Sequence, residues 1–390
     1  MLQDFYGLDE TYQENLLTKY YRKLGHKVIV IASTYDSVFD YVQDNNDSKK
    51  LKSVVYEFGA KIYKLPYSIN ILHKLKKHAG VFEILEKERP DLIYIHDIHL
   101  NLKEAVQYVK INRNCKIIMD YHADYTNSAK NWISLNILHK LIRKPFFNWY
   151  KKYISEIFPV VPASTVFLHE VYNVPLSKMK MLPLGCDYEK CLEIQKNTDT
   201  EALKNSLKIH ENDFVIITGG KFDPIKKTEI LIKAVEKIND TNIHLIVFGK
   251  AAEQFKDYEE ELFNIVKKSN VHFLGWIDND RALEYMTIAD VAIFPASQSV
   301  LWQQAIGMHL PLIVGDLGGQ QPEYLNFYEN MITIKTEDIL EENFGKHILT
   351  LKNDPVLLSK MKEGAKNSAA KHLDYKIICE RTLQVLSNDI

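Results

Sequence analysis

The feature that most constrains the fold is the order of apolar and polar segments between residues 289 and 323. An apolar run at 291–294 is followed by a polar loop at 295–299. A helix-like segment at about 300–308 then leads to a second apolar run at 310–314. Strand, loop, helix and strand in this order are the parts of a βαβ unit, whose parallel strands need a crossover of this kind. The stretch therefore predicts a parallel sheet.

The loops of this unit predict where a ligand binds. Parallel sheets bind ligands outside the carboxyl ends of their strands, where the loops 295–299 and 315–320 would lie. The predicted helix would begin at the same edge, so the free N–H groups of its first turn would face a ligand there. Such N–H groups bind anions, above all phosphate.

Length and composition limit the class of protein. A chain of 390 residues is long enough for two domains with separate cores. A formal net charge of −2 gives no overall field that would favour nucleic acid. The four cysteines lack CxxC spacing, which fits a reducing compartment without a disulfide framework. A polar start and the lack of a long apolar run predict a soluble, cytoplasmic protein, with a place at the inner face of a membrane left open.

Strand and helix patterns alternate twice along the chain. The continuously apolar run 27–32 predicts a buried parallel strand, and strand and helix patterns then alternate as far as residue 172. Polar residues at 188–210 interrupt the pattern, which restarts with a strand at 213–218 and continues to 331–335. This organisation predicts an α/β protein with two Rossmann-like, doubly wound domains facing a cleft. A cleft between domains is the usual ligand site.

Residues 130–157 mix basic side chains with Trp132, Phe146, Phe147 and Trp149. A basic, aromatic and amphipathic pair of helices would fit the surface of an anionic membrane. An ordinary helix pair with its aromatic residues inward explains the same pattern. Both interpretations stay open at the level of the sequence.

The second half opens with two glycines, Gly219 and Gly220, followed by Lys221 and Lys226. Glycines at the end of a strand let a ligand approach the backbone closely. Two cations beside a turn before a helix fit a diphosphate, which needs point charges and N–H donors together. A glycine turn with solvated lysines is the alternative.

Three other polar groups invite a functional interpretation. Asp278 and Asp280 have the spacing of an acidic metal motif, but they directly precede a helix, which favours N-capping. His96 and Asp97 follow a predicted strand, where we expect them to face an acceptor substrate rather than a metal ion. Gly7, in the first loop, would approach the donor phosphate or the acceptor. No metal site and no cofactor are predicted.

Several of these residues also match the pattern of one known family. Gly220, Lys221 and Lys226 fit a Gly-Arg/Lys-x4-Lys turn, Pro295 opens a polar loop, and residues 318–323 read Gly-Gly-x2-Pro-Glu. In this order they resemble the donor domain of GT-B fold glycosyltransferases, close to glycosyltransferase family 4. The resemblance implies that Lys221 and Lys226 hold the diphosphate of a sugar nucleotide. It further implies donor contacts that we expect at Gly219, Trp276, Ile277 and Glu323.

The first half resembles the same family in outline. Residues 25–28 are similar to its Gly-His-x-Val entry to a strand, and residues 120–122 to a strand end carrying an active-site histidine, here His122. Residues 182–187 resemble a Pro-x-Gly-x-Asp hinge. The resemblance implies an acceptor-side domain of residues 1–187 with the C-terminal helix 374–390. Residues 188–373 would form the donor-binding domain.

One departure from the family concerns the acid that contacts the donor ribose. The family commonly has two glutamates eight positions apart, whereas here the second falls on Gln304 and Ala296 stands at the first. Glutamine still accepts a hydrogen bond from a ribose hydroxyl, but without the strength of a charged acceptor. Ser299, Leu301 and Trp302 would offer backbone N–H groups to the diphosphate, with Val300 between them.

The resemblance implies a retaining, metal-independent glycosyltransferase. Its donor would be a UDP-sugar rather than a GDP-sugar. Its acceptor would be a hydroxyl of a glycan or lipid-linked saccharide in bacterial surface polysaccharide synthesis. His122, Lys221 and Lys226 are the expected catalytic residues. Two alternatives remain, namely a sugar-nucleotide epimerase on the same fold and a partner subunit that has lost catalysis.

Overall fold

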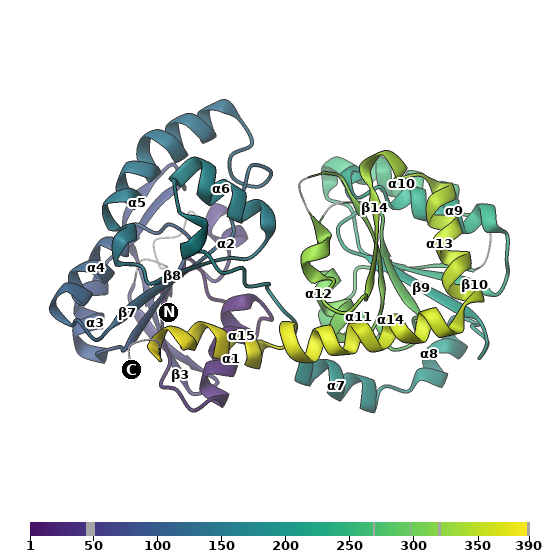
Figure 1. Cartoon of the computed structure of the whole chain (residues 1–390), viewed down its shortest axis with the longest axis horizontal. Helices are drawn as coiled ribbons and strands as arrows, with labels where there is room; N and C mark the ends of the chain where they lie inside the picture. The colour runs from purple at the N-terminus through teal and green to yellow at the C-terminus, as the bar shows by residue number, and fades with distance from the viewer. Residues whose placement is uncertain (44–50, 268–269, 297, 319–320, 388–390) are drawn as a thin grey trace. The chain divides into compact units, whose positions relative to one another are not determined.

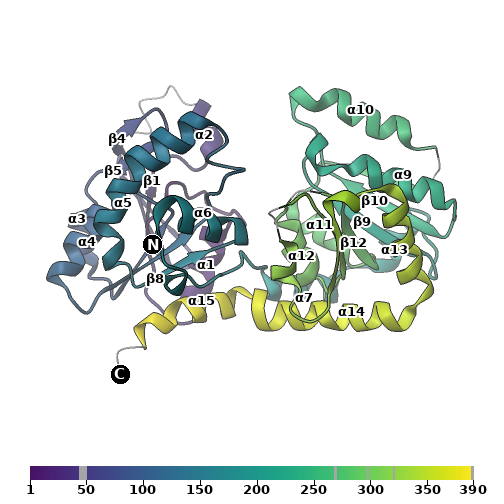
Figure 2. The same ribbon diagram turned by 45° about the horizontal axis from the view of Figure 1, so that its top comes forward.

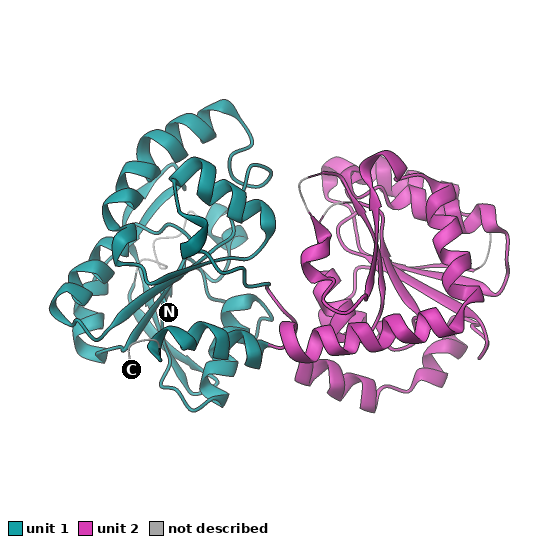
Figure 3. Cartoon of the chain, in the orientation of Figure 1, with its two compact units in different colours: residues 1–183, 375–390 teal, residues 184–374 magenta. Residues whose placement is uncertain are grey.

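The computed structural model describes residues 1–43, 51–267, 270–296, 298–318 and 321–387. The chain forms two compact units (Figures 1 and 3): unit 1 is 1–183 with 375–390, and unit 2 is 184–374. The C-terminal segment thus belongs to unit 1, although the residues before it belong to unit 2. The roles expected for the two halves, acceptor side and donor side, stay predictions.

Unit 2 is built on a six-stranded sheet in which the strand pairs are parallel. Its strands are β9 (Phe214–Gly219), β10 (Ile243–Phe248), β11 (Val271–Gly275), β12 (Val291–Phe294), β13 (Leu312–Asp316) and β14 (Met331–Lys335). They lie side by side in the order β11-β10-β9-β12-β13-β14. This is the strand order of a Rossmann-like sheet, in which the direction of winding reverses between β9 and β12. Ligands of such sheets bind at the carboxyl ends of these two strands.

Helices cover both faces of the unit 2 sheet (Figure 1). They are α7 (Tyr188–Asn197), α8 (Thr200–Ser206), α9 (Thr228–Ile238), α10 (Lys256–Ile265), α11 (Asn279–Met286), α12 (Leu301–Gly307), α13 (Glu341–Asn353) and α14 (Pro355–Ser368). One core contains Trp302 and Ile306 of α12, and the other contains Leu231 of α9 and Phe344 of α13. Because both faces are covered, β10 is buried at every residue, and all of its residues except His244 are apolar.

The sheet of unit 1 has its first strand at the very start of the described chain. Leu2 pairs in parallel with Ile31 on one side and with Ile95 on the other. Residues 1–4 thereby join two three-stranded groups that contain β1 (Ile29–Ser33), β2 (Ser53–Glu57), β3 (Ala60–Leu65), β6 (Leu92–His96), β7 (Lys116–Tyr121) and β8 (Glu156–Pro159). The order becomes β2-β3-β1-(1–4)-β6-β7-β8. Apart from the antiparallel strand β2 it matches unit 2, so the winding reverses between residues 1–4 and β6.

Unit 1 also has helices on both faces of its sheet (Figure 2). They are α1 (Gln13–Lys23), α2 (Val38–Gln43), α3 (Val81–Glu88), α4 (Leu102–Ile111), α5 (Lys144–Tyr150), α6 (Pro162–Tyr172) and α15 (Tyr375–Leu383). The C-terminal helix α15 packs beside α1, where Tyr375 stacks on Tyr20 with ring centroids 6.0 Å apart. The helix expected at 374–388 is therefore present and completes the core of unit 1.

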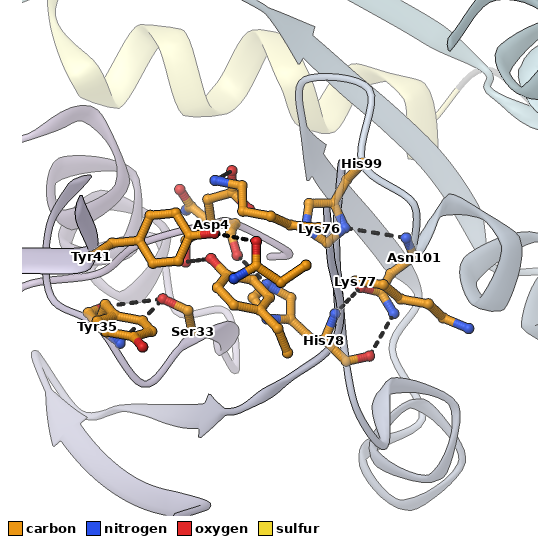
Figure 4. A network of polar contacts seen from close by, with 12 residues as sticks. Asp4, Ser33, Tyr35, Tyr41, Lys76, Lys77, His78, His99 and Asn101 are labelled. Carbon is orange, nitrogen blue, oxygen red and sulfur yellow. Dashed lines mark hydrogen bonds and ion pairs between the residues drawn. The ribbon is translucent and has the colours of Figure 1, made fainter. Parts of the chain in front are cut away.

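A hairpin of β4 (Tyr67–Ile71) and β5 (Leu75–His78) is held against residues 1–4 by a polar network, shown in Figure 4. The Lys76 ammonium lies 2.5 Å from one oxygen of Asp4, and His99 Nε2 lies 3.2 Å from the other. The ammonium also lies over the rings of Phe5 and Tyr41. The network anchors the hairpin at the carboxyl edge of the sheet.

The pair of helices expected within 130–157 is instead one helical run. Residues 134–143 form π-helical turns that continue directly into α5. The aromatic residues divide between its sides, because Phe147 is fully buried whereas Trp132 and Trp149 are 70% and 74% exposed. The expectation of inward aromatics is thus wrong for both tryptophans.

Candidate functional site

Backbone segments approach one another very closely at the carboxyl edge of unit 2. A methyl group placed on Gly249 would lie 1.9 Å from the carbonyl oxygen of Gly220, and one on Gly315 would lie 1.7 Å from that of Pro295. Neither space can hold a side chain, so the turns after β9 and β12 lie directly against their neighbouring strands. The glycine turn after β9 and the loop after β12 therefore both begin at the point where the winding of the sheet reverses.

Lys226 lies at this reversal point. It ends a short 3₁₀ turn, Pro224–Lys226, whose first N–H groups are capped by Asp223. A Cβ placed on Gly220 would be 3.5 Å from the Lys226 ammonium and 3.6 Å from the Leu301 side chain. The second lysine of the predicted pair, the glycine turn and the start of α12 thus meet in one place.

The surroundings of Lys226 favour an anionic ligand. Burial lowers the pKa of its ammonium, and the neighbouring charge of Lys221 lowers it further, against the opposing effect of Asp223. Within the described parts of the chain the ammonium has no hydrogen-bond acceptor and no ion pair. A half-buried cation without an acceptor gains most from a bound anion. Lys221 is exposed on the same turn.

The start of α12 is less open than the sequence suggests. The N–H of Leu301 donates to Ser299 Oγ at 3.3 Å, and the N–H of Trp302 donates to the Ser299 carbonyl at 3.2 Å. Trp302, including its indole, is completely buried. Val300 is 52% exposed at the cap position. Whether these N–H groups also meet a diphosphate stays a prediction.

Two neighbouring glutamines have different surroundings. Gln303 is buried, and its amide oxygen accepts from the N–H of Gly185 at 2.6 Å. Gln304 donates to Asn279 at 2.6 Å, while its own amide oxygen is buried without a partner among the described residues. A buried acceptor without a partner could accept a hydrogen bond from a hydroxyl group of a ligand. Gln304 thus remains the better candidate for the predicted ribose contact.

The remaining donor-side candidates lie on the same edge. Trp276 follows β11 and is 66% exposed, and Ile277 after it is half-buried. Glu323 is exposed in the 3₁₀ turn Pro322–Leu325. Gly319 and Ser297 lie outside the described residues. The ligand contacts expected at Trp276, Ile277 and Glu323 stay predictions.

Asp278 is confirmed as the N-cap of α11, and Asp280 lies in the first turn of that helix. Asp278 accepts a hydrogen bond from the N–H of Arg281 at 2.8 Å, and Asp280 pairs with Lys190 at 3.0 Å. Both carboxylates therefore have structural partners.

The corresponding edge of unit 1 holds a buried carboxylate between two imidazoles. Asp120, which is 0% exposed, accepts from His96 Nδ1 at 3.2 Å and from His122 Nε2 at 3.1 Å. The hydroxyl of Tyr94 donates to the same oxygen at 3.0 Å. The two imidazole rings lie 4.3 Å apart, centre to centre. Sequence reasoning found both histidines but missed the carboxylate that joins them.

Three further acid or loop residues frame this cluster. Asp97 has a left-handed backbone with φ 55°, and its carboxylate accepts from the N–H of His122 at 2.8 Å. Gly7 accepts from the Asn15 side chain at 2.7 Å, which fixes the first loop against α1. Burial raises the pKa of Glu14, in the first turn of α1, while the charges of the two histidines oppose this rise. Nothing in the sequence singles out Glu14.

Two sets of three side chains have metal-ligand types within 4.8 Å: Asp4 with His78 and His99, and Asp120 with His96 and His122. In each set the aspartate hydrogen-bonds to at least one of the histidines. His99 Nδ1 accepts from the N–H of Asn101 at 3.2 Å, so the nitrogen facing Asp4 carries the proton. Both imidazole nitrogens that face Asp120 are likewise placed as donors to a carboxylate.

Two doubly wound α/β units define the class of the chain as GT-B, and solved structures share this fold over nearly the whole length. A structure of Anabaena Alr3699/HepE in complex with UDP is 17% identical, with a TM-score of 0.68 and 99% of each chain covered. The complex of the same protein with UDP-glucose is 18% identical, with a TM-score of 0.65, and covers 99% of this chain and 98% of its own. WaaG, a glycosyltransferase involved in lipopolysaccharide biosynthesis, is 15% identical, with a TM-score of 0.57 and 99% of each chain covered.

Family comparisons are more specific than the fold. Residues 15–190 match Glycosyltransferase Family 4, and residues 199–368 match Glycosyl transferases group 1. The chain belongs to this family of nucleotide-sugar-dependent glycosyltransferases. An uncharacterized glycosyltransferase of Methanocaldococcus jannaschii, MJ1607, is 24% identical over 157 residues. That match covers 38% of this chain and 39% of the relative, so the chain matches well under two thirds of that protein.

Proposed function

We propose that the chain transfers a sugar from a nucleotide donor, a UDP-sugar rather than a GDP-sugar, to a hydroxyl group of a glycan or lipid-linked saccharide. The reaction retains the anomeric configuration and needs no metal ion. The observation that carries this proposal is the place of Lys226, whose half-buried ammonium has no described partner and lies beside Gly220 and Leu301. This is the reversal point of a Rossmann-like sheet, where phosphates of nucleotides bind.

The chemistry that this site supports is electrostatic. Breaking the bond between the anomeric carbon and the phosphate leaves negative charge on the nucleoside diphosphate. Lys221 and Lys226 are positioned to stabilise that charge as it develops. Loss of one such partner typically costs roughly 3 kcal/mol of barrier, about 100-fold in rate. His122 and His96 take the role of hydrogen-bonding partners for sugar groups of the substrates.

The choice of UDP and of surface polysaccharides rests on relatives. The structurally similar HepE binds UDP and UDP-glucose, and the structurally similar WaaG acts in lipopolysaccharide biosynthesis. Trp276, two-thirds exposed at the end of β11, offers a flat ring for a nucleobase.

A thermal-shift panel of nucleotides and nucleotide sugars tests the donor. UDP and at least one UDP-sugar raise the melting temperature of the wild type, because a ligand that binds only the folded state stabilises it. Lys226→Ala abolishes the shift, whereas Lys233→Ala, which removes an exposed lysine of α9, keeps it. A shift with GDP alone contradicts the UDP assignment. No shift with either nucleotide favours a non-catalytic partner subunit, and epimer formation from a UDP-sugar without acceptor favours an epimerase.

We also infer contact with an anionic membrane surface, which fits a cytoplasmic protein acting at the inner face. No helix in the described ranges combines the length and apolar character needed to cross a bilayer. The run 132–150 nevertheless exposes large apolar side chains: Trp132, Ile133, Ile137, Leu141, Ile142 and Trp149. Exposed Lys130 and Lys140 flank them. Apolar residues that enter the headgroup layer and lysines that meet anionic lipid are the two parts of an interfacial helix.

Sedimentation with lipid vesicles tests this contact. The wild type sediments with vesicles containing phosphatidylglycerol and stays in solution with pure phosphatidylcholine. A Trp132→Ser, Trp149→Ser double variant no longer sediments with the vesicles that contain phosphatidylglycerol. Equal sedimentation of the variant and the wild type contradicts the assignment of this surface.

A further inference from the structure

The buried carboxylate of Asp120 determines which nitrogens of two histidines remain for a substrate. A carboxylate can only accept, so the imidazole nitrogens that face it, His96 Nδ1 and His122 Nε2, both carry protons. The opposite nitrogens, His96 Nε2 and His122 Nδ1, belong to half-buried side chains that are 28% and 24% exposed. These two nitrogens are the ones available at the carboxyl edge of unit 1.

The charges around His96 determine its protonation state. Burial disfavours the charged form of His96, but the carboxylate of Asp120, with Asp97 and Glu14, more than offsets this and raises the pKa of His96 to about 10. Coulombic attraction to His96 and His122 holds the pKa of Asp120 well below its ordinary value despite complete burial. At neutral pH His96 is therefore an imidazolium whose Nε2–H donates. With the proton on the nitrogen that faces Asp120, Nε2, His122 presents Nδ1 as its acceptor atom.

We propose that Asp120 is a positioning residue that turns His96 into a hydrogen-bond donor and His122 into a neighbouring acceptor. The rings lie 4.3 Å apart between centroids, a separation that suits adjacent hydroxyl groups on one sugar ring. A hydroxyl both donates and accepts, so a donor beside an acceptor recognises a pair of them. This use of the pair rests on the proposed sugar transfer. The positioning role of Asp120 itself does not.

Other features of the site hold the arrangement in place. The hydroxyl of Tyr94 occupies a further acceptor position on Asp120, and the carboxylate of Asp97 fixes the backbone of His122. The groups that face the pair are thus Tyr94 and Asp97 from β6 and the turn after it, Asp120 from β7, and Glu14 from α1. Outer partners of this kind commonly fix the tautomer of a functional imidazole.

Nitrogen-15 NMR of the histidine rings tests the proposal without any substrate. Spectra of the full chain are recorded in EDTA, and His96→Gln and His122→Gln variants assign the signals. At pH 7.5 both nitrogens of His96 are expected to be protonated, and the proton of His122 is expected on Nε2 with Nδ1 as acceptor. A neutral His96 at this pH, or a His122 proton on Nδ1, overturns the proposal. Tight binding of one Zn²⁺ with both rings deprotonated also overturns it.

The variant Asp120→Asn adds a kinetic readout. It removes the carboxylate but keeps the size of the side chain, so His96 is expected to titrate near 6.5 and His122 to populate both tautomers. Activity of the variant with the transferred nucleotide sugar then falls as pH rises from 6 to 8, whereas the wild type shows no such fall from loss of the His96 proton. An unchanged pH profile overturns the proposal.

Asp124→Asn is the matched control, because Asp124 is also buried, and among the described residues its carboxylate accepts from Thr126 and Asn127 of its own loop. It leaves the ring signals and the pH profile unchanged. If Asp120→Asn does not fold, the wild-type spectra still decide. Ring signals as expected in a chain that transfers no sugar support the role of Asp120 and contradict only the proposed transfer.

Discussion

The two units share a strand order but differ in the chemistry of the edge where their winding reverses. In unit 2 this edge combines glycine turns with Lys221 and Lys226. In unit 1 the same edge holds Asp120 between His96 and His122. One edge is cationic with closely packed backbone, and the other is a neutralised network of hydrogen-bonding side chains. The scaffold thus fixes the place of a site, and the loop residues fix its chemistry.

The two edges suit different chemical groups of the proposed substrates, namely a diphosphate and sugar hydroxyls. In the proposed function a diphosphate needs positive charge, and the ammonium of Lys226, which has no partner among the described residues, would supply it. Sugar hydroxyls need donors and acceptors in a fixed arrangement, which paired imidazoles supply. Substitutions at the two edges are therefore expected to affect different steps.

The largest effect is expected for Lys226→Ala. Loss of the half-buried cation lowers kcat by about 100-fold, since its attraction grows as the leaving diphosphate gains charge. Steady-state transfer rates with the best UDP-sugar measure this loss. Lys233→Ala serves as the control and retains the wild-type rate. An equal loss of rate in Lys226→Ala and Lys233→Ala would show that Lys226 has no special role, and unit 2 would then lack the cationic site that distinguishes it from unit 1.

His122→Ala is expected to have a smaller effect of a different kind. It removes one hydrogen-bonding group toward a sugar, worth about 1 kcal/mol, so kcat/KM falls roughly 5- to 10-fold. The affinity for UDP alone, measured by calorimetry, stays unchanged because the diphosphate edge is intact. A marked loss of UDP affinity would show that the division of roles is wrong.

Gln304→Glu tests the departure from the family pattern. A charged acceptor makes a hydrogen bond stronger by about 1 kcal/mol, so the donor KM is expected to fall roughly 5-fold. The change also removes the hydrogen bond from Gln304 to Asn279, which must turn its amide group to donate instead. Gln304→Ala, in contrast, raises the donor KM. A KM that is the same in both variants contradicts a ribose contact at this position.

The smallest effect concerns stability at the unit 1 edge. Burial lowers the pKa of His78 to about 3, so the folded chain keeps this imidazole neutral. The unfolded chain binds a proton below about pH 6.5, hence stability is lost as pH falls from about 6.5 toward 3. His78→Gln removes roughly 1 kcal/mol of the difference in unfolding free energy between pH 7.5 and 5.5. Urea midpoints at both values measure it, and exposed His26→Gln leaves the difference unaltered.

Much of the unit 2 fold could be predicted because its strands are mostly apolar. The expected strands 243–248, 291–294 and 331–335 agree with β10, β12 and β14. Burial on both faces leaves little room for polar residues in such strands. The lysine turn could also be predicted, since Gly220, Lys221 and Lys226 stand at the spacing of a known family motif.

The missed features of unit 1 are polar or assembled from distant residues. Residues 1–4 lie at the centre of the sheet, yet only Met1 and Leu2 are apolar, and the buried Gln3 is held by backbone pairing. The π-helical turns at 134–143 have no pattern that separates them from α-helix. Asp120 and Glu14 meet the two histidines only after folding, so no local spacing could reveal them.

The helix α15 has a consequence for how the chain acquires its structure. Tyr21 on α1 hydrogen-bonds to Thr382 on α15, two residues separated by 361 positions. During synthesis from the N-terminus, unit 1 must wait for the last part of the chain before that core closes, whereas unit 2 is continuous and can form first. A ribosome that stalls shortly before residue 375 would therefore release a chain with a finished unit 2 and an open aromatic core in unit 1, a natural target for chaperones.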